Sequence, residues 1–201
     1  MTICEPVTNA VWRQTKPVEV QEWLHSLSVP WWIAGGWALD LFLGQVTRPH
    51  ADIDVGIFRR DTVNACTTLS EWEFFEAREG NLTQLEARTT PRKAVYSLWC
   101  KRLSQSEWAF ELMLDEGGDA AWTFRRDANI GCSLERAIRR SADGIPYLAP
   151  EIQLLYKSKA IRSKDQTDFD AVIGYLDQDA RAWLWKSIAR MDPNHAWLSK
   201  L

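Results

Sequence analysis

The chain has 201 residues, enough for a substantial core, and its 46% apolar and 25% charged side chains are ordinary for a globular protein. A formal charge of −3 argues against an extended nucleic-acid partner held along its backbone. No apolar run reaches about eighteen residues, and residues 1–13 lack a basic segment followed by an apolar stretch. We therefore expect no membrane span, no secretory signal and a cytoplasmic location.

Hydrophobic periodicity predicts helices and short strands in alternation along the chain. Amphipathic spacing predicts helices over 17–27, 37–43 and 61–72, and apolar runs predict strands over 31–34, 52–58, 94–101 and 107–116. Helical segments follow at 150–162, 165–176 and 178–190, with Gly174 a weak point. The four cysteines are scattered, which predicts reduced thiols rather than zinc ligands or a disulfide framework.

Two aspartates one residue apart form the most informative motif. On a strand, Asp52 and Asp54 would leave the same face while Ile53 points into the core. Two adjacent anions repel unless a cation lies between them, and Mg²⁺ completes its shell with waters and substrate phosphates. The motif therefore favours a divalent metal site, although a lone Asp-x-Asp is more often a solvated strand end.

The glycine pair Gly35-Gly36 precedes the predicted helix 37–43. Without a Cβ, both residues let the backbone approach a phosphate closely, and the helix would direct its first N–H groups at that anion. A lone Gly-Gly is most often a turn. Beside a metal-binding carboxylate pair, however, a phosphate cradle implies phosphoryl or nucleotidyl transfer.

These motifs carry a family resemblance. The run from Gly35 to Asp40, then Gly44, then 47–54 (Thr-Arg-Pro-His-Ala-Asp-Ile-Asp) resembles the nucleotidyltransferases that adenylylate antibiotics, the aminoglycoside and lincosamide adenylyltransferases. The resemblance implies an α+β fold with a polymerase-β-like core, in which helices flank a mixed sheet. It also implies ATP as co-substrate, a two-ion Mg²⁺ site, and a third carboxylate on a neighbouring strand.

The apolar strand over 107–116 supplies the third carboxylate. Glu111 is its only interior charge, and a buried carboxylate needs a partner, a proton or a metal-lined cleft. We assign it as metal ligand or general base, where the family usually has aspartate. Asp115 has the same parity and is the rival candidate. An ion pair of Glu111 with Arg102 or Arg125 is the structural alternative.

A second distinctive stretch starts at Pro150, where we place a soft boundary between a catalytic core (1–149) and a helical region (150–201). Its Pro-Glu, Lys-x-Lys and Lys-Asp-x-x-Asp series resembles one in many superfamily members, whose basic residues face the triphosphate or hold the helices onto the sheet. Lys157 is the preferred phosphate contact. Alternatively, the lysines only stabilise a helix end, Asp165 caps the next helix and Asp168 supports its first turn.

Two residues flank the metal motif. Arg48 either grips a phosphate oxygen through its planar fork or pairs with Asp40, and we slightly favour the pairing. His50 has no Cys or His partner nearby, so we predict a hydrogen-bonding support rather than a zinc ligand.

Twelve tryptophans predict mainly core packing. Trp31, Trp32 and Trp37 are expected beneath the glycine turn, whereas Trp108 and Trp122 could stack on adenine or a flat acceptor.

We therefore expect a Mg²⁺-dependent nucleotidyltransferase that moves AMP from ATP to a hydroxyl of a small acceptor. A cationic aminoglycoside-type antibiotic suits a carboxylate-rich cleft. The catalytic and metal-binding residues would be Asp52, Asp54 and Glu111, and the nucleotide-binding residues Gly35, Gly36, Arg48 and Lys157. Two alternatives remain: a protein- or RNA-directed enzyme of the toxin–antitoxin type, or a degenerate domain that binds nucleotide without turnover.

Overall fold

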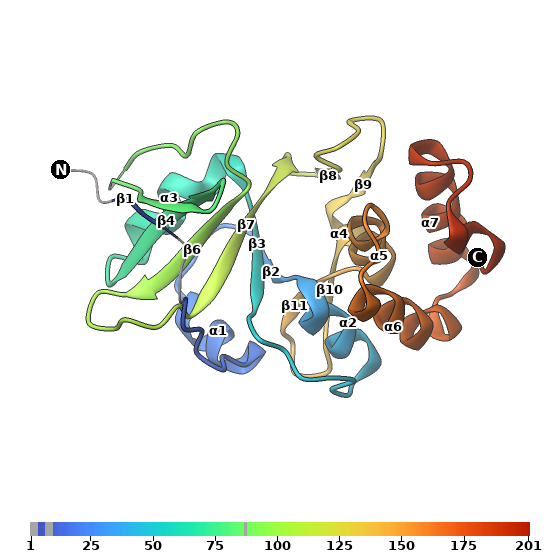
Figure 1. The fold of residues 1–201 in the computed structure, drawn as a ribbon, viewed down its shortest axis with the longest axis horizontal. Coiled ribbons are helices and arrows are strands. Elements are labelled where there is room, and N and C mark those ends of the chain that lie inside the picture. The colour runs from blue at the N-terminus through green and yellow to red at the C-terminus, as the bar shows by residue number, and fades with distance from the viewer. Residues whose placement is uncertain (1–3, 7–9, 87) are drawn as a thin grey trace.

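The computed structural model describes residues 4–6, 10–86 and 88–201 and shows the predicted α+β fold, in which helices flank a mixed sheet (Figure 1). Across the sheet the strands follow the order β1 (Cys4–Pro6), β5 (Asn81–Gln84), β4 (Trp72–Arg78), β6 (Ser97–Arg102), β7 (Phe110–Gly117), β3 (Asp54–Phe58), β2 (Trp31–Ile33), β11 (Pro146–Leu148) and β10 (Ile138–Arg140). Two more strands, β8 (Ala121–Thr123) and β9 (Gly131–Ser133), extend from β7.

The strands at the middle of the sheet set the geometry of the site. β3 runs parallel to β7, which places Asp54 beside Glu111, and antiparallel to β2, which places Val55 beside Ile33. Val55, Ile33 and Leu112 are fully or almost fully buried. Alternation along β3 and β7 therefore sends aliphatic side chains into the core and leaves carboxylates on the other face.

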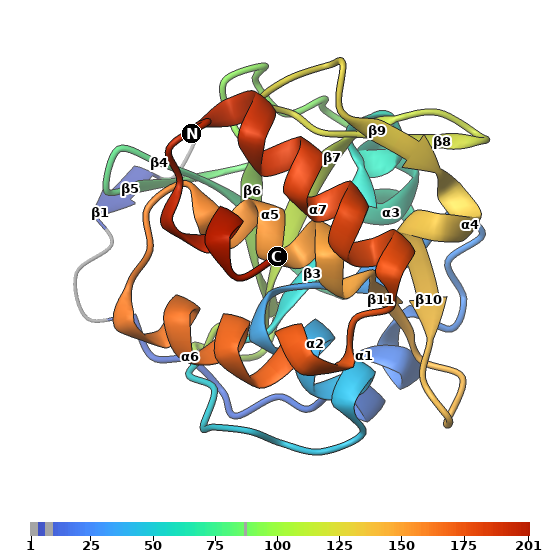
Figure 2. The ribbon, with the colours of Figure 1, turned by 90° about the vertical axis from the view of Figure 1, so that its right-hand side faces the viewer.

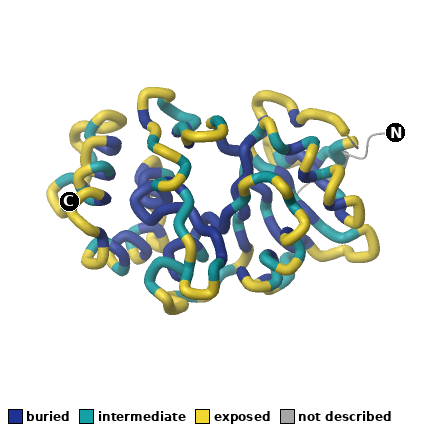
Figure 3. Tube along the Cα trace, turned by 180° about the vertical axis from the view of Figure 1, so that it is seen from behind, coloured by how far each residue is buried: buried dark blue, intermediate teal, exposed yellow. Residues whose placement is uncertain are grey.

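Helices lie on the sheet and pack on one another. They are α1 (Pro17–Leu24), α2 (Gly35–Leu43), α3 (Thr62–Thr68), α4 (Leu134–Ala137), α5 (Pro150–Ser158), α6 (Ser163–Val172) and α7 (Gln178–Met191), with 3₁₀ turns at Arg59–Asp61, Ile173–Tyr175 and Ala196–Ser199. α5 contacts α2, α6 and α7, and Figure 2 shows α7 as the outer helix in front of α5. In Figure 3 the central strands and the inner helix α5 are buried, while exposed residues concentrate in the peripheral loops.

Several predicted boundaries are corrected. β3 begins at Asp54 rather than residue 52, because Asp54 is the first residue in register with β7. α2 begins at Gly35, two residues earlier than predicted. The helix predicted over 61–72 ends at Thr68, since the chain turns there and Trp72 opens β4.

The C-terminal region is helical from Pro150, as expected. The predicted helix 150–162 ends at Ser158, and the next begins at Ser163, before residue 165. Gly174 lies in a 3₁₀ turn that follows α6, which agrees with its predicted weakness as a helix residue. The division into two domains at residue 150 stays a prediction. α5, which follows this boundary, lines the same pocket as β3 and β7, which precede it.

Cys66, Cys100 and Cys132 are free thiols, as predicted, and the side chain of Cys4 lies outside the described residues. No helix in the described part of the chain is long and apolar enough to cross a membrane.

Candidate active site

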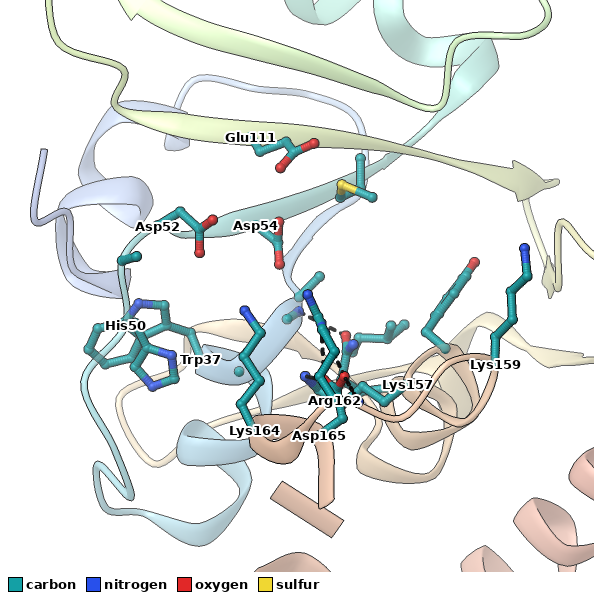
Figure 4. A pocket seen from close by; sticks show the side chains of 18 of the residues that line it. Trp37, His50, Asp52, Asp54, Glu111, Lys157, Lys159, Arg162, Lys164 and Asp165 are labelled. Carbon is teal, nitrogen blue, oxygen red and sulfur yellow. Dashed lines mark hydrogen bonds and ion pairs between the residues drawn. The ribbon is translucent and has the colours of Figure 1, made fainter. Parts of the chain in front are cut away.

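A pocket of about 520 Å³ lies between the β3–β7 face of the sheet and the helices α2, α5 and α6 (Figure 4). It is lined by all seven residues proposed from the sequence, namely Gly35, Gly36, Arg48, Asp52, Asp54, Glu111 and Lys157. The fold therefore brings together residues that stand far apart along the chain.

Three carboxylates form the sheet wall of this pocket. Asp54 opens β3, Glu111 lies beside it on β7, and Asp52 precedes the strand with its side chain near that of Asp54 (Figure 4). Burial, then the charges of Glu111 and Asp52, raise the pKa of Asp54 to about 7. Burial also raises the pKa of Glu111, and the charge of Asp52 adds to this. The wall thus concentrates negative charge, and no basic side chain among the described residues forms an ion pair with Asp52, Asp54 or Glu111.

The two candidates for the third carboxylate have different surroundings. Asp115 accepts hydrogen bonds from the Tyr156 hydroxyl at 2.7 Å and from Trp122 Nε1 at 3.0 Å, so both of its oxygens are used. Glu111 forms no ion pair within the described ranges, and Arg102 pairs with Glu71 instead. The register beside Asp54 therefore favours Glu111.

The glycine turn leaves room for the Asp54 side chain in the pocket. Gly35 has a φ of +66°, and a Cβ at this position would lie 2.1 Å from Asp54 Oδ2. A Cβ at Gly36 would lie 2.5 Å from Arg48 Nη2. The N–H of Gly35 donates to Gln153 Oε1 at 2.8 Å, which fixes the turn to α5. The two glycines are thus needed so that the side chains of Asp54 and Arg48 can lie against the backbone. The sequence had suggested only that they let the backbone approach a phosphate.

A chain of ion pairs forms the helical wall. Asp168 accepts Arg48 Nε at 2.8 Å and Nη2 at 2.9 Å, and it lies 2.9 Å from Lys157 Nζ. Lys157 also donates to Asp165 at 3.0 Å, and Arg162 Nε donates to Asp165 at 2.7 Å. Burial would raise the pKa of both aspartates, but these hydrogen bonds outweigh it and hold both values below the ordinary range.

This network corrects one expectation about pairing. Arg48 pairs with Asp168 rather than with Asp40, whose oxygens accept Thr47 and a 2.6 Å contact from His50 Nε2. Asp165 caps α6, as predicted: it is the third residue of the helix, and its carboxylate accepts the N–H of the N-cap residue Arg162 at 3.1 Å.

His50 has the predicted supporting role. Its Nε2 meets Asp40, and its ring lies 4.5 Å from that of Trp37, which lines the pocket. Trp32 is buried against Gly56 of β3, and Trp37 lines the pocket; the packing of these indoles beneath the glycine turn stays a prediction. The stacking alternative for Trp108 and Trp122 is wrong, because both indoles are buried in the protein.

Further pocket residues were not assigned to the site from the sequence. On α5, Gln153 lies three residues before Tyr156 and four before Lys157, so a helical projection would have placed these three residues on one side of the helix. Arg125, considered above as an ion-pair partner of Glu111, lies in the connection from β8 to β9 and lines the pocket.

The sequence profile of the family described as aminoglycoside-2''-adenylyltransferase matches residues 18–172. The chain belongs to this family. Among curated relatives, 2''-aminoglycoside nucleotidyltransferases of Escherichia coli and Klebsiella pneumoniae are 61% identical over 28 residues, or 14% of this chain. The match spans only 16% of the length of those relatives.

Solved structures of adenylyltransferases share the fold. Lincomycin-bound LnuA, a lincosamide antibiotic adenylyltransferase, is 16% identical with a TM-score of 0.54, over 80% of this chain and 98% of that one. ANT(2'')-Ia in complex with adenylyl-2''-tobramycin is 17% identical with a TM-score of 0.53, over 87% and 95%. The solution structure of ANT(2'')-Ia is 17% identical with a TM-score of 0.56, over 91% of this chain and 92% of that one. At these identities the likeness concerns the fold alone.

The carboxylate wall of this member of the aminoglycoside-2''-adenylyltransferase family fits a hard divalent cation. Burial, and then the charges of Glu111 and Asp52, raise the pKa of Asp54; such an ion would relieve that repulsion, and all the donors are oxygens. Within the described residues, no three His, Cys, Asp or Glu side chains are grouped to hold a metal ion by themselves. Mg²⁺ usually binds one or two carboxylates together with waters and substrate phosphates, so the donor set is suitable.

Proposed function

We propose that the protein transfers AMP from ATP to a hydroxyl of a small acceptor of the aminoglycoside type. Membership of the aminoglycoside-2''-adenylyltransferase family supports this, together with one observation. Asp54 and Glu111, neighbours on β3 and β7, face a pocket whose opposite wall is basic. A carboxylate wall opposite a basic wall suits a metal–triphosphate substrate.

Each proposed residue has a role that follows from its position. Asp52, Asp54 and Glu111 would hold Mg²⁺, with two ions as the family resemblance implies. When bound, Mg²⁺ would neutralise charge on the phosphate oxygens. Gly35 and Gly36 would admit the phosphates at the start of α2.

The basic side chains of the helical wall would face the same phosphates. Arg48 and Lys157 would add positive charge while Asp165 and Asp168 hold them in place. Lys164, which points toward Asp54 in Figure 4, would add a further cation.

The chemical step requires a base beside the acceptor. The acceptor oxygen would attack the α-phosphorus, the bond from that phosphorus to the β-phosphate oxygen would break, and pyrophosphate would leave. Glu111, beside Asp54 on the sheet wall, would either hold the second ion or take the hydroxyl proton as general base.

The deciding experiment measures Mg²⁺-dependent pyrophosphate release from each of the four nucleoside triphosphates, with and without a panel of aminoglycosides and lincosamides. We expect release with ATP and one class of acceptor, and a loss of more than about 100-fold in Asp54→Asn. Asp119→Asn is the control, because Asp119 is an exposed carboxylate outside the pocket.

Full activity of Asp54→Asn would contradict the proposed role of that carboxylate. If no antibiotic of the panel caused pyrophosphate release, the proposed acceptor class would be contradicted. Adenylylation of a protein or RNA would then identify the alternative substrate. ATP binding without any transfer would identify a degenerate nucleotide-binding domain.

A further inference from the structure

Two adjacent arginines line the end of the pocket formed by the connection from β8 to β9, which Figure 1 shows beside α5. The connection is well anchored. Phe124 N donates to Ile130 O at 2.8 Å, and Arg126 Nη1 donates to Tyr156 O at 3.1 Å. Arg125 therefore projects from a fixed loop that is tied directly to α5.

Two tyrosine rings hold the guanidinium of Arg125. Its Cζ lies 4.7 Å from the Tyr96 ring centroid and 5.6 Å from that of Tyr156. These contacts orient the planar group and leave its in-plane N–H groups available. Within the described part of the chain, Arg125 forms no hydrogen bond and no ion pair, although it is half-buried.

Nearby carboxylates do not neutralise Arg125. Its charge acts on both Glu111 and Asp115, yet neither forms an ion pair with it. Asp115 already accepts Tyr156 and Trp122. On the helical wall, by contrast, Arg48 and Lys157 are bonded to aspartates. Arg125 thus has free charge-assisted donors where the other cations have partners.

We propose that Arg125 binds the pyrophosphate end of the nucleotide through its in-plane N–H groups. This inference rests on the proposed nucleotidyl transfer at the same pocket. Gln153 holds the glycine turn and Tyr156 holds Arg125, and these two residues lie about 4.5 Å apart along the axis of α5. Asp54 and Arg125 line the same pocket, so one nucleotide bound there can contact both residues.

Arginine suits this role better than the exposed Lys159 nearby. A planar fork binds phosphate oxygens in pairs, and its orientation by two rings lowers the entropy lost on binding. We expect Arg125→Gln to weaken binding of inorganic pyrophosphate by about 10- to 100-fold. We expect Arg125→Lys to be intermediate, because it keeps the charge and loses the fork.

The experiment compares pyrophosphate and adenosine as separate ligands in calorimetric titrations of the whole protein. Arg59→Gln is the matched control. Arg59 also lies over Tyr96, at 5.5 Å, but it pairs with Glu116 and does not line the pocket. In steady-state assays, Arg125→Gln should raise KM for ATP and the inhibition constant for pyrophosphate together, with little change in kcat.

Loss of pyrophosphate affinity with adenosine binding and the thermal midpoint unchanged would support the proposal. Unchanged pyrophosphate binding, a loss confined to adenosine, or an equal loss of both ligands would overturn it. The proposed function is tested separately. If the wild type transfers AMP and Arg125→Gln binds pyrophosphate as the wild type does, only this inference is overturned. Pyrophosphate binding that depends on Arg125, in a protein that transfers nothing, would overturn only the transfer.

Discussion

The two walls of the pocket treat charge in opposite ways. On the sheet wall, Asp54 and Glu111 lie side by side, neither forms an ion pair with a described residue, and the pKa of each is raised. On the helical wall, Asp165 and Asp168 are bonded to basic side chains, and the pKa of each is lowered. The comparison teaches that the aspartates of the helical wall are already neutralised by basic side chains and hold that wall together, whereas the carboxylates of the sheet wall are available to a metal ion.

The largest expected effect is on stability and comes from breaking the helical wall. The Asp168 side chain is 2% exposed and accepts both Arg48 and Lys157. Asp168→Ala would leave these two cations with less compensation, which should lower the free energy of unfolding by about 3 kcal/mol. Urea unfolding would measure the loss.

Asp170→Ala provides the matched control on the same helix. Asp170 is exposed, and its partners among the described residues are Gln166 and Lys200, so its removal should leave the unfolding curve unchanged. Equal unfolding curves for the two variants would show that the helical wall is no stronger than a surface ion pair.

An intermediate effect is expected from pH. The folded-state pKa of Asp54 is about 7, against an ordinary value of 3.8, so the folded protein binds the additional proton between these values. Stability from this group should therefore be present below about pH 4 and be lost as the pH rises to about 7. Asp168 has a lowered pKa, so its contribution is present above about pH 4 and is lost as the pH falls through its folded-state value.

The two walls should thus give opposite slopes of stability against pH. Unfolding in chelator, at a series of pH values, would compare the wild type with Asp54→Asn and Asp168→Asn. Asp54→Asn should gain stability relative to the wild type between about pH 4 and pH 7. A constant difference between these two proteins over that range would show that Asp54 titrates normally.

The smallest expected effect comes from binding of Mg²⁺ to the carboxylates of the sheet wall. At a Mg²⁺ concentration about ten times its Kd, binding adds about 1.4 kcal/mol, which should raise the thermal midpoint by about 3–6 °C. Asp54→Asn should lose most of this rise. Sodium chloride at matched ionic strength is the control, and an equal rise with it would show screening rather than binding.

The sheet wall could be predicted from the sequence because its signals are local. Asp52 and Asp54 stand in one short motif, and Glu111 is the single charge inside an apolar run. Strand alternation then determines which residues face the pocket. The motif did not reveal that β3 starts only at Asp54, because strand ends depend on pairing with a neighbour.

The helical wall could be predicted only in part. The basic residues of 157–164 were visible, but the partner of Arg48 was not, since Asp168 lies 120 residues further along the chain. Short strands such as β9 and β10 have three residues each, too few to show a period. Arg125 lies in a loop, where its contacts with Tyr96 and Tyr156 depend on the tertiary fold.

The central position of β3 and β7 has a consequence for local unfolding. Both strands have hydrogen-bonded neighbours on either side, whereas α6 makes its backbone bonds mainly within itself. Amide hydrogens of β3 should therefore exchange only when the whole protein unfolds, while those of α6 exchange through smaller openings. The pocket would then open from its helical side, and the carboxylates would keep their relative positions while ligands enter and leave.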